Sequence, residues 1–162
     1  MRIKTKKIIG ITTVSKTKYI LSIGDENVFQ PENGNENEYE TTEYGTEGIY
    51  RETDGYIRIS YDENAELGME GISSTIIIDK NNERKIDLIR DGSMPGSLIF
   101  DLDSPRRLCS YTAFGGTFEM CVCTNDIKIE FSQTGGKIFL DYFIEIRGAR
   151  SMHNIFTLTF RF

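Results

Sequence analysis

The sequence predicts an all-β domain whose strands, about eight to ten in number, close into an antiparallel meander barrel. Composition is the first observation, with 22 isoleucines, 10 phenylalanines and 8 tyrosines against 3 alanines and 8 leucines. Side chains that are β-branched or aromatic fit a pleated sheet, whereas alanine and leucine are typical of helices. The second observation is an alternation of apolar and polar residues that recurs along the chain, with turn residues between the runs. A length of 162 residues predicts one domain, 1–162.

Each predicted strand carries its apolar residues on one face. Ile57, Ile59 and Tyr61 alternate with more polar neighbours, which is the pattern of a strand with one buried side. The same alternation occurs in the runs 72–78, 86–88, 98–100, 118–122, 127–131, 138–146 and 156–162. The tripeptide Thr124-Asn125-Asp126 predicts a hairpin turn in which Val122 would oppose Ile127.

A meander of this length either splits into two packed sheets or closes on itself. Closure removes the exposed strand edges at which proteins aggregate, so we expect a barrel with one shared interior. The amphipathic strands would then direct their apolar faces into that interior.

Residues 25–47 interrupt the alternation with eight acidic and no basic side chains. Self-repulsion and the small number of apolar residues predict a mobile acidic insertion here. The alternative is an arm that binds a partner. The whole chain has a net charge of −6, which makes nucleic acid an unexpected partner.

The three cysteines, Cys109, Cys121 and Cys123, are an odd number, and secreted domains more often carry an even set. We therefore expect reduced thiols in a cytoplasmic protein. The N-terminal apolar run is short and interrupted by threonine, unlike a signal peptide, and no run approaches the length of a membrane span. His153 is the only histidine, and neither it nor the cysteines have the spacing of a metal site, so no metal and no cofactor are expected.

Two charged residues continue otherwise apolar faces. Arg90 follows Ile86 and Leu88 on one strand, and Glu70 precedes the face that contains Ser74 on the strand before it. If Ile78 opposes Ile86, then Ser74 opposes Arg90. A buried guanidinium is costly unless it is paired, or unless it receives a carboxylate or phosphate of a ligand. Arg90, Glu70 and Ser74, with Tyr142 from another inner face, are therefore the candidate ligand-binding residues.

Several short motifs resemble the bacterial YwiB-like proteins, a family of unknown function. The resemblance is carried by Ile59-Ser60-Tyr61-Asp62-Glu63, Gly68-Met69-Glu70-Gly71, Leu88-Ile89-Arg90-Asp91-Gly92-Ser93, Tyr111-Thr112, Gly135-Gly136-Lys137-Ile138 with Tyr142, and Asn154-Ile155-Phe156. It extends over residues 48–162, with residues 7–15 as the first strand. The resemblance implies a calycin-like, lipocalin-like barrel and implies no known reaction or ligand.

No motif in the sequence identifies a reaction, so an enzyme is not expected. The principal hypothesis is a binding module that holds one small amphipathic or apolar ligand in the barrel lumen. The alternative is a filled barrel that interacts with proteins or forms a homo-oligomer. In that case Ile77, Ile89, Phe139 and Phe143 on the predicted outer faces would form an apolar patch.

Overall fold

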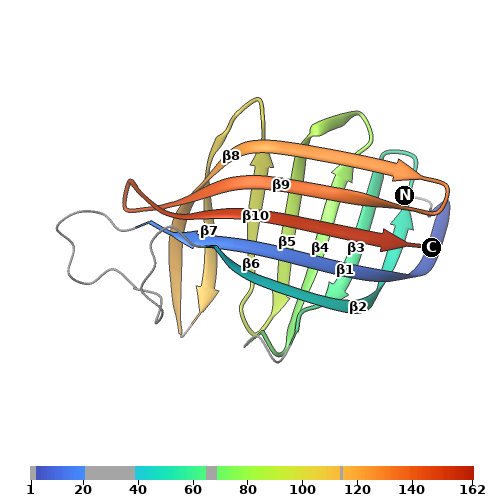
Figure 1. The fold of residues 1–162 in the computed structure, drawn as a ribbon, viewed down its shortest axis with the longest axis horizontal. Helices are drawn as coiled ribbons and strands as arrows, with labels where there is room; N and C mark the ends of the chain where they lie inside the picture. The colour runs from blue at the N-terminus through green and yellow to red at the C-terminus, as the bar shows by residue number, and fades with distance from the viewer. Residues whose placement is uncertain (1–2, 21–38, 65–68, 114) are drawn as a thin grey trace.

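The computed structural model describes residues 3–20, 39–64, 69–113 and 115–162 (Figure 1). These residues form ten strands, namely β1 (Thr5–Tyr19), β2 (Glu40–Glu52), β3 (Tyr56–Asp62), β4 (Ile72–Asp79), β5 (Asn82–Gly92), β6 (Gly96–Asp101), β7 (Arg106–Ala113), β8 (Gly116–Ser132), β9 (Gly135–Ile146) and β10 (Ala149–Arg161). The same residues include no α-helix with the length and apolarity needed to cross a membrane.

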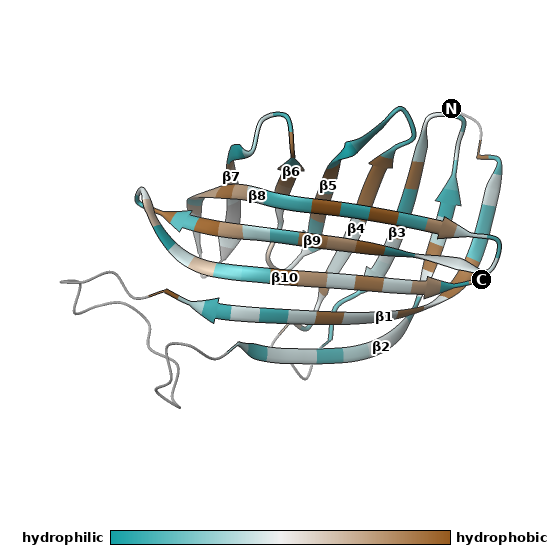
Figure 2. Cartoon of the chain, turned by 45° about the horizontal axis from the view of Figure 1, so that its top comes forward, coloured by the Kyte–Doolittle hydropathy of each residue, from teal (hydrophilic) through white to brown (hydrophobic). Residues whose placement is uncertain are grey.

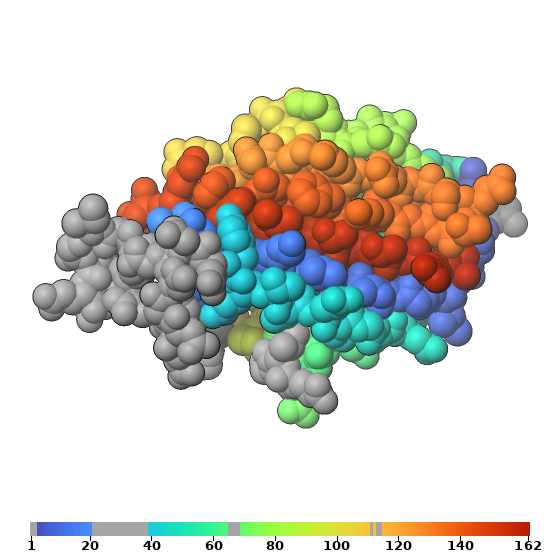
Figure 3. All heavy atoms as spheres, in the orientation of Figure 1, coloured from blue at the N-terminus to red at the C-terminus, as the bar shows by residue number. Residues whose placement is uncertain are grey.

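Every strand pairs antiparallel with its neighbours in the chain, and β1 pairs with β10 to close the barrel. The predicted all-β meander barrel is thus confirmed. The strands β8, β9, β10, β1 and β2 run across the front, and β3 to β7 cross behind them (Figure 1). Along the front strands, hydrophobic and hydrophilic residues alternate (Figure 2). The outward side chains of these five strands make a continuous front surface (Figure 3).

The expected hairpin at Thr124-Asn125-Asp126 is wrong. Residues 116–132 form the single strand β8, and the register with β9 shifts between Thr124 and Asp126. Turn-forming residues here make a β-bulge, which inserts an extra residue and bends a strand without ending it. Val122 therefore opposes Ile144 of β9, and Ile127 opposes Leu140.

The prediction of an acidic insertion over residues 25–47 is wrong for residues 40–47. Residues 40–47 belong to β2, where they pair with residues 10–17 of β1. Glu43 and Glu47 lie on the face opposite to Thr42, Tyr44 and Thr46, a strand pattern that the high charge hid. Residues 25–38 lie outside the described part of the chain.

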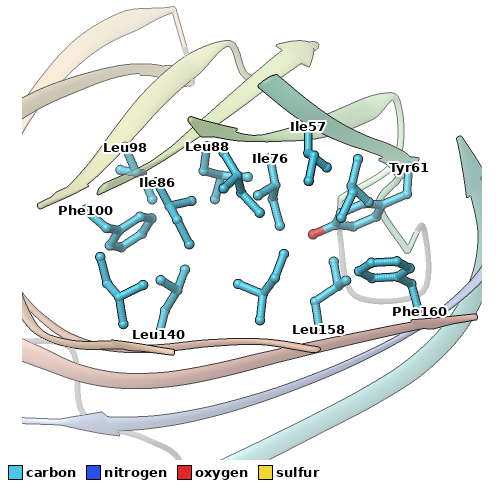
Figure 4. Close-up of a cluster of buried hydrophobic side chains, with 14 of the residues drawn as sticks. Ile57, Tyr61, Ile76, Ile86, Leu88, Leu98, Phe100, Leu140, Leu158 and Phe160 are labelled. Carbon is cyan, nitrogen blue, oxygen red and sulfur yellow. The ribbon is translucent and has the colours of Figure 1, made fainter. Parts of the chain in front are cut away.

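The core lies between the two crossing layers. Side chains of β3 to β6 point toward those of β9 and β10 (Figure 4). The largest fully buried side chains are Phe100, Phe160, Ile9, Ile59, Ile76, Ile78, Ile86, Ile138, Leu140, Leu158 and Val122. At the end of the barrel near the C-terminus, Phe160 packs against Tyr50 and Phe131. Burial of this hydrocarbon supplies the main driving force for folding.

The barrel is weakly sealed between β6 and β7, which share only the residue pair Gly96 and Tyr111. At the other end of this seam, hydrogen bonds that involve side chains connect Asp101 to the strands beyond it, where the backbone ladder is missing. Its Oδ2 accepts a hydrogen bond of 2.7 Å from Arg107 Nη2. Its backbone N–H donates to Thr124 Oγ1 at 3.1 Å. Asp101 is 6% exposed, so its charge acts where water screens it little.

We expect Asp101→Asn to lower the free energy of unfolding by about 1.5–3 kcal/mol, because the variant loses a charged hydrogen-bond acceptor. The hydrogen bond from Arg107 holds the pKa of Asp101 below its usual range. The stabilisation should therefore be present above about pH 4 and be lost as pH falls through the pKa of the folded state. Urea denaturation across this pH range measures both effects.

The matched control is Asp103→Asn, which removes the exposed ion pair with Arg84. Exposed pairs contribute little, so a change below about 1 kcal/mol is expected. Equal effects of the two substitutions would contradict the role of Asp101 in the seam.

Candidate functional site

The inner wall of the barrel changes from hydrocarbon to polar side chains along β1. Ile11 and Thr13 are buried, at 2% and 6% exposure. Ser15 and Thr17 have the same inward parity but are half-buried. Thr17 Oγ1 donates a 2.8 Å hydrogen bond to Oδ1 of Asn154 on β10. Since inward side chains are shielded only where the interior is filled, this part of the lumen is more open and more polar than the core.

Beside this polar half, two strands of the wall separate. β2 pairs with β3 only from Gly48 to Glu52, whereas it pairs with β1 along its whole length, from Glu40 to Glu52. Tyr44, in the first half of β2, spans the separation by donating a 2.6 Å hydrogen bond to the carbonyl oxygen of Asp62. Burial raises the pKa of Tyr44 to about 12, and the nearby charges of Glu63 and Asp62 add to the rise. The phenol therefore stays protonated and remains a donor at neutral pH.

Arg90 lies on the inner face of β5, close to this separation. It opposes Ser74 of β4, and Ile78 opposes Ile86, so the predicted register is confirmed. The Arg90 Nε atom is buried, and no group in the described residues accepts a hydrogen bond from it. No carboxylate of those residues is within ion-pair distance either. A buried donor without an acceptor costs free energy. The Nε atom of Arg107 is also buried without an acceptor, but Nη2 of Arg107 pairs with Asp101. Of these two arginines, only Arg90 lacks a carboxylate partner among the described residues.

Tyr61, Glu63 and Ser74 form a hydrogen-bonded group next to Arg90. The fully buried Ser74 donates from Oγ to Glu63 Oε1 at 2.5 Å. Burial raises the pKa of Tyr61 strongly, Glu63 raises it further, and the positive charge of Arg90 opposes the rise. The Tyr61 hydroxyl points into the space between the two layers of the core (Figure 4). The group therefore presents a protonated phenol inside the barrel.

Tyr142 comes from β9 on the opposite layer, and its ring packs edge-on against Phe100 at a centroid distance of 4.7 Å. Burial raises the pKa of its phenol, and Arg90 again acts in the opposite direction. The charge of Arg90 therefore acts on the phenols of both Tyr61 and Tyr142. Three of the four sequence candidates, Arg90, Ser74 and Tyr142, are thus brought together.

Glu70 does not join this group. It is exposed in the turn before β4, where its carbonyl oxygen accepts a hydrogen bond from Ser93 Oγ. Gly71 has a φ of 75°, so the chain bends there and the alternation of β4 does not extend back to Glu70. Glu63 takes the place expected for Glu70. The alternation of Ile57, Ile59 and Tyr61 continues to Glu63. This alternation predicts that Glu63 lies on the inner face.

His153 lies on the outer face of β10. Its Nε2 is 2.6 Å from Asp141 Oδ1, and its Nδ1 is 2.7 Å from the Tyr39 hydroxyl. Its ring stacks on Phe143 at 4.4 Å. These contacts attach the start of the described segment at Tyr39 to the barrel wall, outside the lumen.

Neither of two hollows on the surface of the described residues is lined by the residues around Arg90. One, of about 420 Å³, lies at the β8–β9 turn beside Phe131 and Phe160. The other, of about 500 Å³, lies on the outer face beside Arg106, Cys121 and Glu145. The polar interior around Arg90 is therefore a separate feature.

Comparisons with known proteins agree with this architecture. Residues 27–158 match the model of a family described as a domain of unknown function, DUF1934. A solved structure, the ywiB protein from Bacillus subtilis, superposes with a TM-score of 0.73 at 18% sequence identity. The match covers 98% of this chain and 94% of that one. At this identity the likeness concerns the fold alone. No curated protein matches the sequence.

We expect Arg90→Met to leave the free energy of unfolding unchanged or to raise it by up to about 2 kcal/mol. Methionine fills a similar volume and removes a buried donor that has no acceptor, and such exchanges are often neutral or stabilising. Leu88→Ala on the same strand is the contrasting variant, with an expected loss of about 2–5 kcal/mol. Chemical denaturation measures both. A loss above about 2 kcal/mol for Arg90→Met would show that Arg90 is needed to hold the barrel together.

Proposed function

This chain belongs to the DUF1934 family of domains of unknown function, and we propose that its barrel binds one small amphipathic molecule through an anionic head group at Arg90. The observation that carries the proposal is the buried Nε of Arg90, which has no acceptor among the described residues. A carboxylate or phosphate would supply that acceptor in bidentate geometry. The lipocalin-like character that the sequence resemblance implies, and a cytoplasmic location, belong to the same proposal.

The surroundings of Arg90 suit an anion better than a cation. Tyr142 keeps its proton because burial raises its pKa, so its phenol can donate to an anionic head group. The proton of the Tyr61 hydroxyl is already donated to Glu63, and the Ser74 hydroxyl donates to the same carboxylate. The donors open to a ligand are therefore the cationic Arg90 from β5 and the neutral Tyr142 from β9.

An apolar tail would find partly buried apolar side chains at the margin of the core. Met120, Met152 and Phe156 are only partly buried, yet they pack against the core cluster. Methionine side chains are flexible and polarizable, and they adapt to irregular apolar ligands. Displacement of water from this surface would add to the affinity.

Self-association of a filled barrel has less support. Ile77, Ile89, Phe139 and Phe143 lie on outer faces but are half-buried rather than exposed. The Lys128 ammonium lies 5.3 Å from the centre of the Phe139 ring, and His153 stacks on Phe143. These aromatic surfaces are partly covered within the chain itself.

The proposal predicts that decanoate binds the purified protein at one site and that Arg90→Gln weakens this binding at least about tenfold. The variant loses a charged hydrogen bond, and about 1.4 kcal/mol corresponds to that factor. Isothermal titration calorimetry measures the affinity. Native mass spectrometry of protein purified without denaturation would show a co-purified anion in the wild type that is depleted in Arg90→Gln.

The matched control is Arg58→Gln, which removes the same charge from an exposed position on β3, two strands from β5 in the sheet. Its affinity for decanoate should equal that of the wild type. Equal weakening in both variants would indicate a general charge effect, and unchanged affinity in Arg90→Gln would contradict the proposal.

A further inference from the structure

A second cluster of chemically competent side chains lies on the outer face of β8 and β9, away from the lumen. Cys121 and Cys123 are two residues apart on β8, so both point to the side opposite the core residue Val122. Their Sγ atoms are 3.9 Å apart. Glu145 of β9 lies directly opposite Cys121 in the ladder. The strand pairing thus brings two thiols and one carboxylate to the same place.

The separations in this cluster suit one cation. The ligand atoms of Cys121, Cys123 and Glu145 all lie within 4.8 Å of one another. Two sulfurs bound to a tetrahedral zinc at about 2.3 Å each are about 3.8 Å apart. The observed 3.9 Å therefore requires almost no movement of the two sulfurs, whereas a disulfide would require them to approach to about 2.05 Å.

A positive charge already occupies the neighbourhood of these groups. Arg106 Nη2 forms a 2.7 Å ion pair with Glu145 Oε2. The Arg106 side chain is 68% exposed, whereas that of Glu145 is 13% exposed. Arg106 can therefore swing into solvent without loss of core packing, and a metal ion would replace one cation with another.

The cluster is also accessible. Cys121, Glu145 and Arg106 line the outer hollow of about 500 Å³. A metal held by three protein ligands would have its fourth position toward this hollow, as in sites that keep one position for water or a further ligand. Cys123 is 8% exposed, so the ion would be partly shielded at its base and open on one side.

We propose that Cys121, Cys123 and Glu145 bind a thiophilic divalent cation of the zinc class, with Arg106 as the group that the metal displaces. Thiolate ligands favour zinc, cadmium or cobalt over magnesium and calcium. The proposal is independent of ligand binding at Arg90. It also revises the expectation of no metal site, because Glu145 joins the cysteines only through the pairing of β8 with β9.

The test is a titration of the reduced, metal-free full-length protein with Co²⁺, followed by the sulfur-to-cobalt charge-transfer absorption and by competition with Zn²⁺. One equivalent should bind. Cys121→Ser and Cys123→Ser should each weaken binding more than about 100-fold, and Glu145→Gln should weaken it about tenfold or more. Cys109→Ala is the matched control, because Cys109 is a buried thiol outside the cluster, and it should bind as the wild type does.

Arg106→Ala gives a result that loss of folding cannot mimic. Because the substitution removes the competing cation from an exposed position, Co²⁺ affinity should rise about two- to fivefold. Absence of the charge-transfer band in the wild type would overturn the proposal. Equal binding by the wild type and both serine variants, or weaker binding by Arg106→Ala, would overturn it as well. Thermal unfolding of each variant confirms that the barrel is intact.

Discussion

The pairing of the first strand with the last is the constraint on which the structure depends. Residues 10–19 of β1 pair with residues 152–161 of β10, and this ladder turns a linear meander into a barrel with one interior. Because side chains alternate across a strand, the register also decides which residues face inward. A slip of one residue would turn Lys16 and Lys18 into the lumen in place of Ser15 and Thr17.

Closure creates an interior with two different regions. In one, isoleucine, leucine and phenylalanine fill the space between the layers, as expected of a core that stabilises the fold. In the other, Ser15 and Thr17 of β1 have inward parity but remain half-buried, and Thr17 bonds to Asn154 of β10. Arg90 carries a buried donor that the described residues leave without an acceptor, a feature that stability alone does not explain. Departures of this kind are expected where a protein is organised for function.

Much of the barrel could be predicted from the alternation of residue types, because a strand with one buried face shows a period of two. The same rule predicts that Ser74 opposes Arg90, as the ladder of β4 and β5 confirms. The predictions were wrong where the local preference of a segment differs from the conformation that the surrounding sheet imposes. Thr124, Asn125 and Asp126 are turn residues, yet the sheet on both sides kept β8 continuous through a bulge. Glu70 was assigned to a strand face that ends at Gly71, a backbone bend that composition does not reveal.

Features that require the pairing of distant strands could not be predicted from single segments. The acidic residues of β2 concealed a strand because charge is usually read as loop, and β1 supplied the pairing that orders it. For the same reason Tyr44 was absent from the candidate residues around Arg90. Glu145 approaches the two cysteines only because β9 folds back along β8. In each case the sequence shows the residue types, but it does not show which strands pair with one another.

The central claim is that Arg90 is an anion-binding residue inside the barrel, and the Nε–H group of Arg90 reports on it directly. In a ¹H–¹⁵N spectrum of the side chains, Arg90→Lys identifies the Arg90 cross-peak by its disappearance. Titration with decanoate should shift this cross-peak saturably and slow its exchange with water, because a buried donor gains an acceptor. A cross-peak that stays unchanged at saturating decanoate would contradict the account.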